Sequence, residues 1–179
     1  KRILVIGAGP SGMESARLLA MRGHRVEIWE QDKDIGGTVR VAALAYEPNE
    51  GLINYLKNSL YELGVKIKLK TTATPESVKA FNPDHVIVAV GAKRDAPSIK
   101  GKGGKNVFDG EQLRGLLFGS DANAIKKLSL FQQVILKAGR ATQLLRNIYA
   151  LRFLSKIWMP FSKNIVVIGG DLVGLELAE

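Results

Sequence analysis

The chain has 179 residues, with 26 Lys and Arg against 17 Asp and Glu, a formal charge of +9, two His and no Cys. Its length fits one domain and the beginning of a second, and an apolar content of 46% argues against disorder. Because Cys is absent, these residues cannot form a disulfide, a redox thiol pair or a Cys-ligated metal site. The two isolated His, His24 and His85, do not predict a metal site either.

The positive charge is concentrated in one part of the chain. Residues 1–112 carry 17 basic and 13 acidic side chains, whereas residues 113–163 carry nine basic side chains and one acid. Residues 164–179 carry three acids and no base. A basic segment can bind nucleic acid or an anionic membrane. We expect no nucleic-acid partner, because the segment contains no reading motif and no aromatic stacking platform.

The two ends predict a piece of a longer, cytoplasmic protein. The first residue is Lys1, and an apolar strand begins at once, without a signal peptide before it. No stretch reaches the roughly 18 apolar residues of a membrane-spanning helix. At the other end, Ile165–Ile168 predicts a buried strand, followed by a Gly-rich turn and a helix over Leu172–Glu179. These elements form only half of a unit, so we expect a fragment.

The beginning of the chain predicts a strand, a glycine turn, a helix and a second strand. Arg2–Ile6 is a short apolar run typical of a parallel strand buried on both faces. It leads into Gly7–Gly12, which fits the pattern GxGxxG. Apolar residues at helical spacing predict a helix over Met13–Arg22, and Arg25–Trp29 predicts the second strand.

Each part of this unit has a role in binding an adenine dinucleotide. Gly7 allows a tight turn, Gly9 lets the backbone approach the pyrophosphate, and Gly12 lets helix and strand pack closely. The helix N-terminus offers N–H groups and a partial positive charge to the phosphates. Glu30 follows Gly12 by 18 residues, where its carboxylate can accept hydrogen bonds from both ribose hydroxyls and repel a 2′-phosphate. The spacing favours a dinucleotide site over a plain strand-to-helix turn and disfavours NADP there.

The middle of the chain predicts further helices and strands in alternation. Helical spacing covers Leu52–Leu63, strand alternation covers Val65–Leu69, and a Thr-Pro-Glu start predicts a short helix over 75–80. A strand is predicted over 85–90. This order predicts an α/β fold, a Rossmann-like parallel sheet with flanking helices, in which Trp29 belongs to the core.

Three further segments carry a resemblance to a known family. Gly36-Gly37 follows the ribose acid, where an NAD-type Rossmann domain needs no second Gly pair. Residues 85–92 read HVIVAVGA, and residues 165–176 read IVVIGGDLVGLE. With the first glycine motif, these segments resemble the two-dinucleotide-fold flavoproteins of the pyridine nucleotide-disulfide oxidoreductase superfamily. The amino-acid sequences of these segments are most similar to those of the NADH:flavin oxidoreductases related to 2,4-dienoyl-CoA reductase and trimethylamine dehydrogenase.

The resemblance implies cofactors, domains and site residues. It implies FAD, or alternatively ADP, in a domain over 1–112, and NAD(P)H at a truncated second site over 164–179, with 113–163 as a basic helical insertion or linker. It also implies a barrel domain outside this chain, with FMN and an iron–sulfur cluster. No catalytic or metal-binding residue is identified. The candidate cofactor-binding residues are Gly7, Gly9, Pro10, Ser11, Gly12, Glu30, Gln31, Gly36, Gly37, Thr38, Arg40, Ala89, Val90, Gly91, Gly169, Gly170, Asp171 and Gly174.

Two positions depart from the family pattern. Asp171 stands where the second motif normally has Gly, so its carboxylate would crowd and repel a pyrophosphate. We hypothesise that pyridine nucleotide binding is weakened or rearranged there, with a loop that bends away as the alternative. Val90 stands where the family usually has Thr and keeps the β-branched shape, so we expect it to be tolerated.

Residues 121–159 have a helical pattern and look like an insertion. We expect Ser120 or Asp121 to cap the start and Pro160 to mark the end. Gly139 either divides the segment into a helical hairpin or lies within one long helix. Three interpretations are open: packing on its own protein, docking to another subunit or to the absent barrel, and a basic amphipathic surface for an anionic membrane or an acidic carrier.

The function expected from these features is that of part of a flavin-dependent NAD(P)H oxidoreductase. The chain would bind FAD and relay electrons from NAD(P)H toward another redox centre, in a protein that is a homo-oligomer at full length. It is not expected to be active alone. The alternative is a non-catalytic ADP-binding or assembly module. A plain NAD-dependent dehydrogenase is disfavoured by Gly36-Gly37 and by the second glycine motif.

Overall fold

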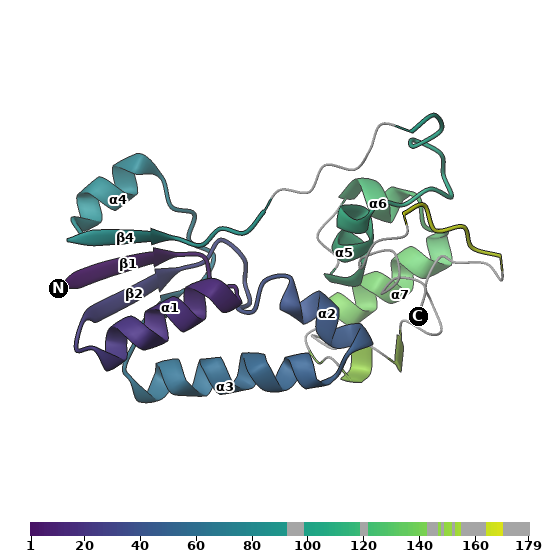
Figure 1. The fold of residues 1–179 in the computed structure, drawn as a ribbon. Helices are drawn as coiled ribbons and strands as arrows, with labels where there is room; N and C mark the ends of the chain where they lie inside the picture. Colours follow the sequence, from purple (N-terminus) through teal and green to yellow (C-terminus); the bar gives the residue numbers. More distant parts are fainter. Residues whose placement is uncertain are drawn as a thin grey trace. The chain divides into compact units, whose positions relative to one another are not determined.

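The structure is a computed structural model that describes residues 1–92, 99–118, 122–142, 147, 149–151, 153–154 and 164–169. It consists of two compact units, Lys1–Lys93 and Arg94–Glu179, and each is described by itself (Figure 1). Among the described residues, none of the helices is long and apolar enough to cross a membrane.

The first unit is built on a parallel four-stranded sheet in the order β3-β2-β1-β4. The central strand β1 pairs with β2 from Arg2↔Arg25 to Ile6↔Trp29, and with β4 from Ile3↔His85 to Ile6↔Val88. All four predicted strands of this unit are confirmed, with β3 and β4 shorter than predicted. The strands are β1 Arg2–Ile6, β2 Arg25–Trp29, β3 Lys66–Lys68 and β4 His85–Val88.

Helices cover both faces of this sheet, with α1 and α3 on one side and α4 on the other (Figure 1). The predicted helices are confirmed, but α1 and α3 begin earlier than predicted, at Pro10 and Pro48. Proline fits the first turn of a helix because its fixed φ is helical and no N–H partner is needed there. The helix α2 was not predicted. The helices are α1 Pro10–Met21, α2 Val39–Ala45, α3 Pro48–Glu62 and α4 Pro75–Phe81.

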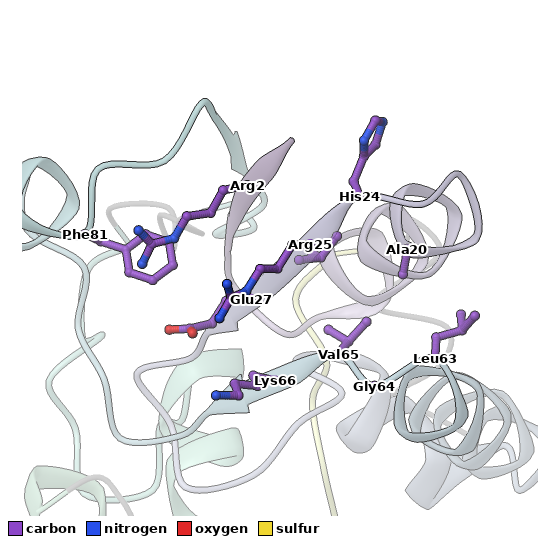
Figure 2. Close-up of a pocket in the computed structure, with 11 residues that line it drawn as sticks. Arg2, Ala20, His24, Arg25, Glu27, Leu63, Gly64, Val65, Lys66 and Phe81 are labelled. Carbon is purple, nitrogen blue, oxygen red and sulfur yellow. The ribbon is translucent and has the colours of Figure 1, made fainter.

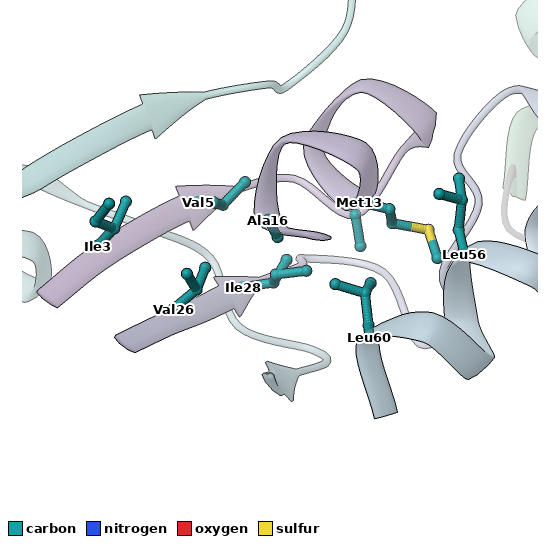
Figure 3. Packing of buried hydrophobic residues seen from close by; sticks show 9 residues of the cluster. Ile3, Val5, Met13, Ala16, Val26, Ile28, Leu56 and Leu60 are labelled. Carbon is teal, nitrogen blue, oxygen red and sulfur yellow. The ribbon is translucent and has the colours of Figure 1, made fainter. Parts of the chain in front are cut away.

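The core of this unit lies between the sheet and the helices α1 and α3. Alternate residues of β1 and β2 point to this side, and Met13 of α1 reaches toward Leu56 of α3 (Figure 3). The predicted core position of Trp29 is confirmed, on the other face of the sheet. Its ring packs edge-on against the ring of Phe81, with 5.2 Å between the ring centres. The cluster comprises Ile3, Val5, Ala8, Met13, Ala16, Val26, Ile28, Leu56 and Leu60.

The second unit contains α5 Gly110–Phe118, α6 Ala122–Lys126 and α7 Leu130–Ala141. Within the predicted helical segment 121–159, the described residues form helices over 122–126 and 130–141, with a break just before α7, and Gly139 is buried within α7. A new helix begins there because Ser129 and Gln132 form a capping box: the Gln132 N–H donates to the Ser129 hydroxyl at 3.3 Å, and the Ser129 N–H donates to Gln132 Oε1 at 3.0 Å.

A Lys side chain and buried leucines hold this second unit together. Lys127 donates to the carbonyl of Val107 at 2.6 Å and to Gln112 Oε1 at 3.0 Å. Its ammonium also lies 5.1 Å from the centre of the Phe108 ring. The buried apolar residues of the unit are Leu116, Ala124, Leu128, Leu136 and Leu151.

One strand predicted near the end of the chain is not formed. Ile165–Ile168 has no regular secondary structure, and all four side chains are exposed. A parallel strand needs neighbours for its backbone hydrogen bonds, and none of the described strands pairs with this segment. The predicted caps at Ser120 and Asp121, the end at Pro160 and the final helix lie outside the described residues.

Candidate dinucleotide-binding site

The loop between β1 and α1 is pressed against the end of β4. Gly7 has a φ of 103°, and a Cβ added to it would collide with the carbonyl oxygen of Ala89. A Cβ on Gly12 would collide with the carbonyl oxygen of Gly7 and lie 3.3 Å from the Ala89 Cβ. Both positions therefore require glycine, because another main chain occupies the space of a side chain.

Gly9 differs from these two glycines because it borders open space. No heavy atom lies within 4 Å of a Cβ built on it. Its carbonyl accepts the first hydrogen bond of α1, from the Met13 N–H at 2.9 Å. Pro10 and Ser11 form the first helical turn, where N–H groups have no partner within the helix. This arrangement can receive an anionic group such as a pyrophosphate close to the backbone.

Glu30 lies at the end of β2 with only 8% of its surface exposed. Its Oε2 accepts a hydrogen bond from the Ala8 N–H at 2.7 Å, and its Oε1 accepts one from the Asp32 N–H at 2.8 Å. Its main chain is fixed as well, because its N–H donates to the carbonyl of Lys68 and its carbonyl accepts from the Thr71 N–H, both at 2.8 Å. Each carboxylate oxygen has two acceptor positions, so each keeps one for a ligand hydroxyl.

The second glycine pair packs onto the first loop. The Gly36 N–H donates to the carbonyl of Ala8 at 2.8 Å, and a Cβ on Gly37 would lie 3.2 Å from the Gly9 Cα. Thr38 then provides the N-cap position of α2. Arg40, one of the candidate cofactor-binding residues, forms an ion pair with Asp34 at 2.9 Å.

The residues that follow β4 are the last segment that borders the candidate site. The Ala89 N–H donates to the carbonyl of Ile6 at 2.8 Å, and this bond extends the β1–β4 ladder beside Gly7. Val90 is 68% exposed, and Gly91 has a φ of 77°, which favours glycine. Residues 89–91 therefore leave the sheet at its carboxyl edge, directly after β4.

Most of the predicted site residues thus come together at the carboxyl ends of the strands, where open α/β sheets bind their ligands. The glycine loop, Glu30, the pair Gly36-Gly37 and the segment over 89–91 adjoin one another, and exposed Gln31 follows Glu30. From the second motif, Gly169 is described in the second unit, with a φ of 126°. Gly170, Asp171 and Gly174 lie outside the described residues.

The sequence alone did not identify Ala8 and Asp32 as partners of the site carboxylate. Both act through a backbone N–H, which every residue except proline carries, so their residue types gave no signal. Within the part of the chain that the structure describes, no group of three or more His, Cys, Asp or Glu could hold a metal ion.

A pocket of about 250 Å³ lies at the opposite, amino-terminal edge of the sheet. Its lining includes charged side chains from the three strands β1, β2 and β3, namely Arg2, Arg25, Glu27 and Lys66 (Figure 2). Lys68 pairs with the carboxylate of Glu27 at 2.8 Å and the Trp29 indole N–H donates to it at 2.6 Å. Burial raises the pKa of Glu27, but these hydrogen bonds and the nearby Lys charges outweigh burial, so that the pKa lies below its ordinary value.

Comparison with known proteins identifies the family. The family model of the pyridine nucleotide-disulphide oxidoreductases matches residues 1–179, the whole chain. The chain belongs to this family. The α/β fold class and the resemblance drawn from the glycine motifs are therefore confirmed.

Individual relatives in this family are reductases, oxidases and dehydrogenases. The bilirubin reductase of Mediterraneibacter gnavus (strain CC55_001C) is 33% identical over 100% of this chain, and the NADH oxidase of Thermoanaerobacter brockii is 30% identical over 99% of it. The chain spans 22% of the length of each. A solved complex of 2-naphthoyl-CoA reductase matches 82% of this chain and 27% of its own, with a TM-score of 0.62 and 31% identity. These relatives confirm the resemblance to the NADH:flavin oxidoreductases.

Proposed function

We propose that the first unit binds FAD, and that the full-length protein is an FAD-dependent NAD(P)H oxidoreductase that relays electrons from NAD(P)H toward another redox centre. The observation that carries the proposal is the packing of Gly36-Gly37 onto the glycine loop, with Gly37 against Gly9. This second pair extends the site beyond the ribose acid Glu30, and a domain that binds only NAD has no need of it.

The described residues fit an FAD molecule. Glu30 presents acceptors for the ribose hydroxyls, and the space beside Gly9 receives the pyrophosphate against the start of α1. The segment over 89–91 then borders the site on the side of β4. Bound FAD supplies the hydride and electron transfer, while this chain binds and orients the cofactor and leaves no side chain at Gly9 to crowd its phosphates.

The other parts of the proposal concern the remainder of the protein. Residues 1–112 form the FAD domain, 113–163 an inserted helical segment, and 164–179 the start of a second, NAD(P)H-binding domain. Because the chain has no Cys, an iron–sulfur cluster would have to be held by residues outside it. We propose that such a cluster and FMN belong to a barrel domain, and that the full-length protein is a homo-oligomer. The chain spans only 22% of the length of the bilirubin reductase and of the NADH oxidase, which supports the presence of further domains.

The first experiment identifies the nucleotide in the purified full-length protein. An absorption spectrum followed by chromatography of the nucleotide released on denaturation should yield FAD. Release of ADP from a colourless protein would support a non-catalytic assembly module instead. Release of NAD would contradict the proposal.

Two glycine variants then test whether the second pair forms the site. Gly37 and Gly64 both have a positive φ, of 53° and 68°, so alanine strains the backbone at either position. A Cβ on Gly37 points at Gly9, whereas nothing lies within 4 Å of a Cβ on Gly64, in the turn after α3. We expect Gly37→Ala to lose FAD and Gly64→Ala to retain it. Equal FAD content in both variants would remove the main support for the proposed site.

A further inference from the structure

The outward face of α7 is apolar. Leu130 is 82% exposed, Phe131 74% and Val134 64%. With 3.6 residues per turn, these three positions share one side of the helix with Ala138 and Ala141, which are exposed as well. A surface helix of a globular protein normally presents polar residues on this side.

The opposite side of α7 faces the interior of its unit. Leu136 is only 2% exposed and Gly139 is buried. Gln132 and Gln133 are half-buried and their side chains form hydrogen bonds nearby. Gln132 Oε1 accepts from the Ser129 N–H, and the Gln133 amide donates to the carbonyl of Leu128, both at 3.0 Å. Leu130, Phe131 and Val134 therefore lie on the exposed side, while two polar amides are half-buried on the other, a distribution typical of an interaction surface.

Residues after α7 show the same division between buried and exposed apolar groups. Tyr149 is 58% exposed and Phe153 is 65% exposed, whereas Leu151 between them is 1% exposed. The second unit thus has its own buried leucines and presents two further aromatic rings to solvent. Exposed aromatic rings together with aliphatic side chains are typical of surfaces that meet the boundary between water and lipid, and the hydroxyl of a tyrosine ring can stay in water there.

The charge of the segment favours an anionic occupant of this surface. Lys126 and Lys137 are exposed, and the sequence contains no Asp or Glu between Asp121 and Asp171. A protein partner would need to supply apolar and acidic groups in a matching arrangement. The surface of an anionic bilayer supplies both everywhere, because acyl chains lie directly beneath the negative headgroups.

We propose that the outward face of α7, formed by Leu130, Phe131 and Val134 and flanked by Lys137, binds the surface of an anionic lipid membrane. The helix lies on the membrane and does not span it. Its apolar side chains enter the headgroup boundary and the lysines contact anionic headgroups. This role is independent of the proposed FAD site, which lies in the first unit.

The test is flotation of the full-length protein with vesicles. We expect binding to phosphatidylcholine vesicles that contain about 30 mol% phosphatidylglycerol, and weak binding to phosphatidylcholine alone. The double variant Phe131→Ser, Val134→Ser should bind the anionic vesicles at least about tenfold more weakly. Its control is Tyr61→Ser, which removes an 86% exposed ring from α3 in the first unit and should bind like the unaltered protein.

A charge-reversal pair tests the electrostatic part. Lys137→Glu should weaken binding to anionic vesicles by about fivefold or more, whereas Lys57→Glu, at an exposed position of α3, should not.

Three results would overturn the proposal. The first is no preference of the unaltered protein for anionic vesicles. The second is an oligomer that the double variant dissociates, which would make the face an interface between copies of this chain. The third is a marked loss of thermal stability in the double variant without lipid, which would show that the rest of the protein covers the face.

Discussion

The carboxylate of Glu30 and the backbone of Ala8 are joined by a hydrogen bond of 2.7 Å, across the gap between the end of β2 and the glycine loop. The other carboxylate oxygen accepts from the Asp32 N–H. Glu30 thus ties the loop to the neighbouring strand and also presents acceptors for a ribose. Its loss should affect both the shape of the loop and the affinity for the cofactor.

Replacing Glu30 should therefore weaken cofactor binding. We expect Glu30→Ala to reduce FAD affinity by about 1–3 kcal/mol, or about fivefold to 150-fold, because it removes the ribose acceptors and leaves two backbone donors without their partner. Quenching of flavin fluorescence on titration of apoprotein gives the dissociation constant. Glu62→Ala, at the exposed end of α3, serves as the control. Unchanged FAD affinity in Glu30→Ala would show that the ribose contact is wrongly assigned.

Replacement by alanine should change the stability of the protein in opposite directions at two glycines that lie within helices. A Cβ on Gly12 would collide with Gly7, so Gly12→Ala should displace α1 from β1 and destabilise the protein by about 2 kcal/mol or more. Gly51 is exposed in α3 with nothing near its Cβ, so Gly51→Ala should stabilise by about 0.5–1 kcal/mol. Thermal unfolding of the full-length protein distinguishes the two. A neutral Gly12→Ala would contradict the close approach of helix and loop.

The charged pocket at the other edge of the sheet should make stability depend on pH. The pKa of Glu27 lies below its ordinary value of 4.5, so the charged form stabilises the fold above that pH. This contribution is lost as the pH falls through the lower pKa of the folded state. We expect Glu27→Gln to cost about 1 kcal/mol at neutral pH, with the difference disappearing in acid well below pH 4.5. Urea unfolding at both pH values measures it, and a constant difference would contradict the assignment.

Asp171 should limit the second nucleotide site. Its carboxylate replaces the glycine expected nearest the pyrophosphate, and two like charges about 4 Å apart in water repel by about 1 kcal/mol. We expect Asp171→Gly to raise the affinity of the full-length protein for NADH or NADPH by about fivefold. Isothermal titration with each nucleotide measures the change. Equal affinities in the two proteins would mean that the loop bends away from the phosphates.

Local patterns predicted most of the first unit because its elements are encoded by neighbouring residues. The four strands, three of the four helices and the GxGxxG loop follow from apolar spacing, glycines and prolines that act within a few positions. The starts of α1 and α3 were misplaced because their prolines were not used as first-turn residues. In the second unit, the Ser129–Gln132 capping box begins α7 and so sets the break between α6 and α7, whereas Gly139 lies within α7.

By itself the sequence determined which residue types stand at the dinucleotide site, because glycine, proline and acid have distinct backbone and charge properties wherever they occur. Only the tertiary structure decided that Gly37 lies against Gly9, that Ala89 occupies the space of a Gly7 side chain, and that Ala8 holds Glu30. The same holds for the exposure of Phe131. Contacts between distant segments depend on how the elements pack, and spacing along one element does not contain that information.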